Sequence, residues 1–144
     1  MIVRHAEIKD LSNLVRLTRR LHEGSDWKWV PFSPAMLRRN LTSMIRKPDF
    51  CVLVAEHEGE LTGLLYGTVD QMLYSKTLFA TDMEFAAERG GGELLDAFRD
   101  WAKQVGAKVL IMGVSDSGRE SAKDRFFSKH GLTRTGGLYQ EVLQ

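Results

Sequence analysis

The sequence has little of what several protein classes depend on. Its 144 residues include one cysteine and three prolines, and the net charge is only +1. A single cysteine excludes an internal disulfide, and we interpret Cys51, which lies in an apolar run, as a buried structural thiol in a reducing, cytoplasmic compartment. The small net charge argues against nucleic acid as an obligatory partner.

Long apolar segments are also missing. No stretch approaches the roughly 20 apolar residues that cross a bilayer, and the first ten residues lack the apolar core of a signal peptide, so we expect no membrane partner. The four histidines show no metal-ligand spacing, and we predict no metal. The remaining composition, 43% hydrophobic and 27% charged, is that of a globular protein, and the length predicts a single domain over residues 1–144.

The hydrophobic pattern predicts the order of elements. A strand at residues 2–6 precedes an amphipathic helix that ends at Gly24, and a second helix begins with Ser33 as its N-cap. Short apolar runs from residue 50 predict three antiparallel strands, the first two joined by a turn at Glu58 and Gly59.

Helices and strands alternate in the second half of the chain. A helix ends at Gly106, a strand covers residues 108–114, a helix capped by Ser117 extends to about Lys129, and a final hairpin turns at residues 136–137. Strands joined through a helix are parallel neighbours. The sequence therefore predicts an α/β (α+β) fold with a mixed, mostly antiparallel seven-stranded sheet flanked by about four helices.

Three successive glycines separate a strand from a helix in the segment ERGGGELL. Glycine lets backbone amides approach an anion closely, a helix start adds unpaired N–H groups, and Arg89 adds a forked cationic donor. The segment suits a pyrophosphate, although three glycines also make an ordinary flexible turn. It lacks the lysine and hydroxyl of a P-loop and does not open a dinucleotide-binding βαβ unit.

Two tryptophans, Trp27 and Trp29, flank a lysine in a segment with neither helical nor strand period. On a loop they are suited to clasp an acceptor or a partner protein, or alternatively they close the edge of the core. Trp101, in contrast, continues the apolar stripe of its helix, and we predict that it is a core residue.

Three longer stretches carry a wider pattern. They are IVRHAEIKDLSNLVRL at 2–17, ERGGGELLDAFRDWAKQVGAKVLIMGV at 88–114, and AKDRFFSKHGLTRTGGLY at 122–139. Together they resemble the GNAT superfamily of N-acetyltransferases, in particular compact bacterial or bacteriophage-encoded members. The resemblance implies transfer of an acetyl group from acetyl-coenzyme A to a primary amine of a protein or small molecule. The cofactor-binding residues that it implies are Phe85, Ala86, Arg89, Gly90, Gly91, Gly92 and Glu93.

Such a reaction needs a base, because a lysine-like amine is mostly protonated at neutral pH and attacks a thioester only when neutral. Asp82 and Glu84 stand two apart on a predicted strand, and we expect both to point to one face of the sheet. We rank Glu84 first and Asp82 second as catalytic residues; the alternative is that both are solvated charges. Residues 51–100 carry three basic and ten acidic side chains, which favours a cationic acceptor.

Two features depart from the family pattern. The pyrophosphate loop is shorter than usual, and Phe127 stands where many members have a tyrosine that protonates the departing thiolate. Phenylalanine has no such proton. Tyr66, Tyr74 and Tyr139 are the alternative sources of this proton, although we expect each to be a sheet residue with a satisfied hydroxyl. The two departures favour an alternative function, that of a non-catalytic module of the same fold that binds a partner or host protein.

Overall fold

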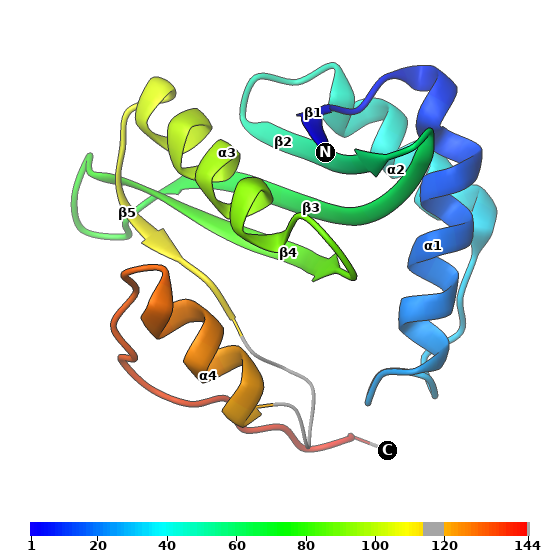
Figure 1. Ribbon diagram of the computed structural model, residues 1–144. Helices are drawn as coiled ribbons and strands as arrows, with labels where there is room; N and C mark the ends of the chain where they lie inside the picture. The colour runs from blue at the N-terminus through cyan, green and yellow to red at the C-terminus, as the bar shows by residue number, and fades with distance from the viewer. Residues whose placement is uncertain (114–119, 144) are drawn as a thin grey trace.

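The computed structural model describes residues 1–113 and 120–143, and a five-stranded sheet lies at its centre (Figure 1). The strands follow one another in the order β1-β2-β3-β4-β5. Neighbours are antiparallel except for β4 and β5, which are parallel. The strands are β1 (Ile2–His5), β2 (Phe50–His57), β3 (Glu60–Gln71), β4 (Leu78–Ala87) and β5 (Ala107–Ile111). The predicted mixed, mostly antiparallel sheet is confirmed.

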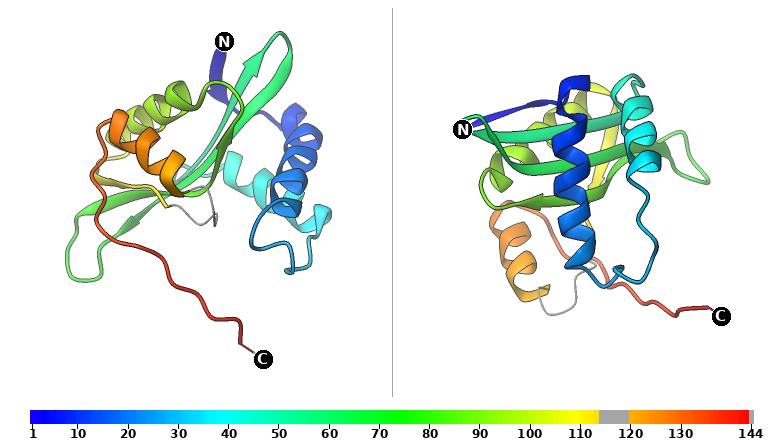
Figure 2. Two further views of the ribbon diagram at one scale, coloured as in Figure 1. Left: turned by 60° about the horizontal axis from the view of Figure 1, so that its bottom comes forward. Right: turned by 90° about the vertical axis from the view of Figure 1, so that its right-hand side faces the viewer.

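Helices cover both faces of this sheet (Figure 2). On one face, a single 3-10 turn, η1 (Ile8–Asp10), leads into α1 (Leu11–Glu23), and α2 (Pro34–Ile45) packs beside α1. On the other face lies α3 (Gly91–Gln104). The last helix, α4 (Glu120–Lys129), packs its aromatic side chains against the start of α3. Among the described residues, no helix combines the length and apolar character that crossing a bilayer requires.

Strand β2 divides the core by simple alternation. Val52 and Val54 point toward α1 and α2, whereas Cys51 points toward α3 with its neighbours on that face. Cys51 is 1% exposed, and Trp101 is 8% exposed and stacks on Phe98 with ring centroids 5.6 Å apart. The predictions of a buried thiol and of a core tryptophan are both confirmed.

Local signals in the sequence set several element boundaries. The Ser33 hydroxyl accepts the backbone N–H of Met36 at 3.1 Å and so caps α2. Glu58 and Gly59 both have positive φ, 51° and 81°, which a two-residue hairpin turn requires. Helix α4 extends to Lys129 as expected, and its predicted cap, Ser117, lies outside the described residues.

The predicted seven strands are wrong, because the described residues after α4 form none. The final hairpin was predicted from turn chemistry at residues 136–137 and from the resemblance of residues 122–139 to the family pattern. A two-stranded hairpin is marginal in water unless it packs an apolar face on other elements. Leu138, Tyr139 and Leu143 are all exposed, so the end of the chain buries no such face.

Candidate active site

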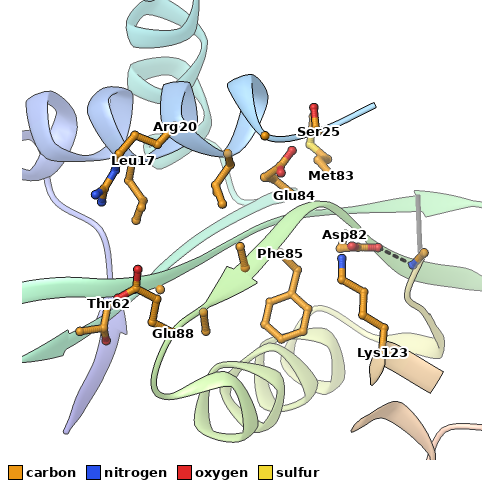
Figure 3. Close-up of a pocket in the computed structure, with 16 residues that line it drawn as sticks. Leu17, Arg20, Ser25, Thr62, Asp82, Met83, Glu84, Phe85, Glu88 and Lys123 are labelled. Atoms are coloured by element: carbon orange, nitrogen blue, oxygen red, sulfur yellow. Dashed lines mark hydrogen bonds between the residues drawn. The ribbon is translucent and has the colours of Figure 1, made fainter. Parts of the chain in front are cut away.

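The sheet opens between its last two strands. Pairing of β4 with β5 ends at Thr81 and Ile111, whereas β4 continues to Ala87. Beyond Thr81 the edge of β4 therefore faces an opening, which we call the splay. A cleft of about 380 Å³ follows this edge from Asp82 to Glu88 (Figure 3).

Both faces of the sheet contribute walls to this cleft. Lys123 of α4 forms part of one side, and α1 and the loop after it form the other. The residues on the α1 side are Leu17, Arg20, Leu21, Gly24 and Ser25. Because α1 and α4 lie on opposite faces, the cleft passes through the sheet at the splay. Two molecules can therefore meet there from opposite sides.

A β-bulge at Met83 decides which way the two carboxylates point. Glu84 pairs with Tyr66 of β3 and Asp82 pairs with Gly67, so that Met83 is the extra residue. Tyr66 belongs to the α1 side of the core, whereas a side chain at Gly67 would point into α3. Directly opposed residues share a face, so Glu84 faces α1 and Asp82 faces α3 and α4. The predicted common face is wrong, because the bulge interrupts the alternation.

Asp82 lies where β4 and β5 separate. Its Oδ1 accepts the backbone N–H of Gly113 at 2.9 Å, and the ammonium of Lys123 points toward it from α4 (Figure 3). Burial raises the pKa of the Asp82 carboxyl above its ordinary value, although the Gly113 N–H and the Lys123 charge act in the opposite direction. Asp82 thus connects β4, the chain after β5 and α4.

Glu84 lines the cleft on the α1 side, and its carboxylate is directed toward the loop that follows α1 (Figure 3). Its partner across the sheet, Tyr66, is buried, and the hydroxyls of Tyr66 and Thr18 share a hydrogen bond of 2.8 Å. Burial raises the pKa of Tyr66, and the nearby Glu84 charge raises it further. Tyr66 is therefore a sheet residue with a satisfied hydroxyl, as expected.

The glycine segment begins α3 just beyond the end of β4. Gly90, the N-cap, has φ 87°, and a Cβ there would lie 2.9 Å from that of Ala55. A Cβ at Gly92 would lie 2.9 Å from the His130 ring, whereas one at Gly91 would make ordinary contacts. Close packing thus explains two of the three glycines. No side chain caps this helix, so the N–H groups of its first turn suit an anion.

The predicted cofactor residues fall into two groups. Phe85 and Ala86 line the cleft. Arg89 to Glu93 are not among the described residues that line it; they lie at the α3 start. Arg89 is exposed, and its Nη1 is 3.0 Å from Nε2 of His57. The structure thus separates an anion-suited helix start from the cleft along β4.

Phe127 is buried beside the cleft. Its ring centroid is 6.2 Å from that of Phe85, and the neighbouring Phe126 ring is 5.8 Å from the same partner. These contacts hold α4 against β4. Position 127, where the resemblance implies a tyrosine, therefore supplies packing and no hydroxyl.

Trp27 and Trp29 lie on the loop that follows Ser25, itself a cleft residue. They are 43% and 55% exposed, and their ring centroids are 6.5 Å apart. Such exposure argues against the alternative in which they close the edge of the core. Neither is among the described residues that line the cleft.

Our sequence reasoning missed Lys123. Its place in the site depends on how α4 packs across the splay, which no local pattern reports. The available signal was its spacing, four residues before Phe127 and so on the same face of one helix.

Comparisons with known proteins identify the fold. No family model and no curated protein matches the chain, but many solved structures do. One is an aminoglycoside acetyltransferase from an uncultured soil metagenomic sample, in complex with sisomicin: 19% identity, 99% of this chain and 95% of that chain covered, TM-score 0.72. Another is glucosamine-6-phosphate N-acetyltransferase from Arabidopsis thaliana: 15% identity, 99% and 98% covered, TM-score 0.77.

A third neighbour is a transcriptional regulator from Bacillus halodurans C-125, with 20% identity, 98% and 99% of the two chains covered and a TM-score of 0.78. Sequence identities this low show a shared fold but not a shared reaction, which has to be argued from the residues of the site. The chain has the fold of the GNAT N-acetyltransferases, as the resemblance implied.

Proposed function

We propose that the chain is an N-acetyltransferase that moves the acetyl group of acetyl-coenzyme A to a primary amine of a protein or small molecule. The observation that supports this most directly is the cleft through the splay, which has an open strand edge along it and a carboxylate, Glu84, on its α1 side. Two neighbours in fold are acetyltransferases with amine-bearing acceptors, an aminoglycoside and glucosamine-6-phosphate.

The residues at the α3 start and along the splay fit acetyl-coenzyme A in two places. The uncapped N–H groups of Gly91, Gly92 and Glu93 suit the pyrophosphate, with Gly90 forming the turn and Arg89 nearby as a cation. The open edge of β4 at Phe85 and Ala86 offers backbone N–H and C=O groups to the pantetheine amides. When bound, acetyl-coenzyme A supplies a thioester carbonyl that an amine can attack.

Glu84 is the proposed base, acting directly or through one water. It faces α1, the side from which the acceptor would approach, and so it can take a proton from the amine before attack. Asp82 is the second candidate. Its carboxylate faces α4 and already accepts the Gly113 N–H, and we therefore rank it below Glu84.

The acceptor is proposed to enter between α1 and β4, with Trp27 and Trp29 on the adjoining loop as its contacts. Exposed aromatic rings favour a cation through their faces, and the carboxylates of Glu84 and Glu88 add negative charge to the cleft. A cationic amine is the acceptor class that these groups suit. A single cytoplasmic domain is part of this proposal, and the lone buried Cys51 agrees with a reducing compartment.

The test is acetyl transfer from labelled acetyl-coenzyme A to a panel of amines and to cell extract. Glu84→Gln should lower turnover by roughly 10² to 10⁴, with coenzyme A binding retained. The loss should shrink as pH approaches the amine's own pKa, near 10.4 for a lysine-like amine, because the acceptor then deprotonates without a base. Glu60→Gln, on an exposed part of β3, is the matched control.

Equal rates in the parent and in Glu84→Gln would remove Glu84 from the mechanism. Binding of coenzyme A without transfer to any acceptor would contradict the proposal and favour the non-catalytic module that binds a partner protein. A protein that neither binds coenzyme A nor transfers acetyl groups would refute the cofactor assignment as well.

A further inference from the structure

We infer that Lys123 is a catalytic residue that stabilises the departing thiolate of coenzyme A, in place of a hydroxyl donor at position 127. The inference rests on the proposed function. It begins with the position of Lys123, which lines the cleft from α4 with its ammonium directed toward Asp82 (Figure 3).

The geometry of α4 places Lys123 beside the reacting end of the cleft. Lys123 and Phe127 are four residues apart and share one helix face, and the Phe127 ring packs on Phe85 of β4. Lys123 therefore lies about one 5.4 Å turn from Phe127, at the level of Asp82, where β4 and β5 separate. A pantetheine chain that starts at the α3 N-terminus and follows β4 inward would bring its sulfur toward this point.

The tyrosines do not supply a donor there. Tyr66 is buried on the α1 side and bonded to Thr18, and Tyr74 and Tyr139 are exposed. The lone thiol, Cys51, is buried in the core. Among the described residues, charged side chains line the cleft from α1, from β4 with the residue after it, and from α4. These side chains are Arg20 of α1, Asp82 and Glu84 of β4, Glu88 after β4, and Lys123 of α4.

The chemical step balances with these groups. The amine nitrogen forms a bond to the acetyl carbon, the carbon–sulfur bond breaks, and its electron pair stays on sulfur. Glu84 takes the proton that the amine loses. The Lys123 ammonium then stabilises the new negative charge on sulfur. An opposite charge within about 4 to 6 Å favours the ionised form of a thiol.

The experiment measures the pKa of the thiol of bound coenzyme A, from the ultraviolet absorbance of its thiolate, with the desulfo-coenzyme A complex as blank. In the parent this pKa should be about 1 to 3 units below that of free coenzyme A. Lys123→Met should raise it by at least about 1 unit, whereas Lys123→Arg keeps the charge and should keep the low value. Lys129→Met, exposed on the same helix, is the control and should change nothing.

Equal thiol pKa values in the parent and in Lys123→Met would overturn the role of Lys123, even where transfer of acetyl groups continues. A parent protein that does not bind coenzyme A would instead refute the proposed function and this inference with it. Because Lys123 is only partly buried, we expect the Lys123→Met variant to fold. Lys123→Gln provides a second neutral side chain at this position for the same titration.

Discussion

Replacing Gly67 by alanine should destabilise the fold, although alanine is normally the better residue in a strand. A Cβ at position 67 would lie 2.3 Å from Cε1 and 2.6 Å from Cζ of Phe98. Carbon atoms in good contact are about 3.5 to 4.0 Å apart, so the ring would have to move by about 1 Å. Phe98 is fully buried and stacks on Trp101, which leaves the ring little room to move.

The magnitude follows from two opposing effects. Gly→Ala in an unobstructed strand gains about 0.5 to 1 kcal/mol through lower backbone entropy in the unfolded chain. Overpacking a well-packed core costs about 1 to 3 kcal/mol and outweighs this gain. The middle values of these two ranges, a cost of about 2 kcal/mol and a gain of about 0.75 kcal/mol, leave a net loss of about 1 kcal/mol. This loss lowers the thermal midpoint by about 2 to 4 °C in a domain of this size.

Thermal and denaturant unfolding of Gly67→Ala, followed by circular dichroism, measures this effect. Gly136→Ala is the control, because nothing lies within 4 Å of a Cβ there, and it should stay within about 0.5 kcal/mol of the parent. Gly67→Ala combined with Phe98→Leu should cost less than the sum of the single changes, because the smaller side chain relieves the contact. An unchanged or higher midpoint in Gly67→Ala would refute the argument.

Three further predictions concern the core and the N-terminal ion pair. Trp101→Ala should cost about 3 to 5 kcal/mol in denaturant unfolding, and a parent-like midpoint would contradict its place in the core. Burial raises the pKa of Cys51 to about 12, so an alkylating reagent should modify it only upon unfolding; rapid labelling of native protein at neutral pH would disprove this. Arg4 donates to Asp10 at 2.8 and 3.0 Å and holds the pKa of that carboxyl below its ordinary 3.8. The stability that this ion pair adds is therefore complete at pH values above the ordinary pKa of the carboxyl, and it is lost as pH falls through the lower pKa of the folded state. The unfolding free energy of Asp10→Asn should therefore decline less steeply with falling pH than that of the parent, as measured by denaturant unfolding at several pH values.

Regular elements with local start and stop signals were predictable from the sequence. Helix α2 has its cap at Ser33 and its proline in the first turn, and the Glu58–Gly59 turn has the residues that positive φ favours. In each case the relevant interactions span a few residues, so the sequence pattern contains them.

The arrangement of the site depends on contacts that local patterns do not contain. The bulge at Met83 arises from the register of β4 against β3, and it places Asp82 and Glu84 on opposite faces although they are two residues apart. Likewise, Gly92 is explained by His130, which lies directly after another helix, α4. The end of the chain shows the converse, since the chemistry for a turn at residues 136–137 was present without a surface on which a hairpin could pack.

The splay also divides the molecule into two parts that should open at different free energies. β5 pairs with β4 only as far as Thr81, whereas β2 pairs with β3 over its whole length (Figure 1). Native-state hydrogen exchange should therefore find a low-energy partial unfolding in which β5 and α4 open together while β1 to β4 stay protected. The amides of β5 would then exchange through this local opening, and those of β2 only through global unfolding. The cleft would lie at the boundary between a rigid unit and one that opens often.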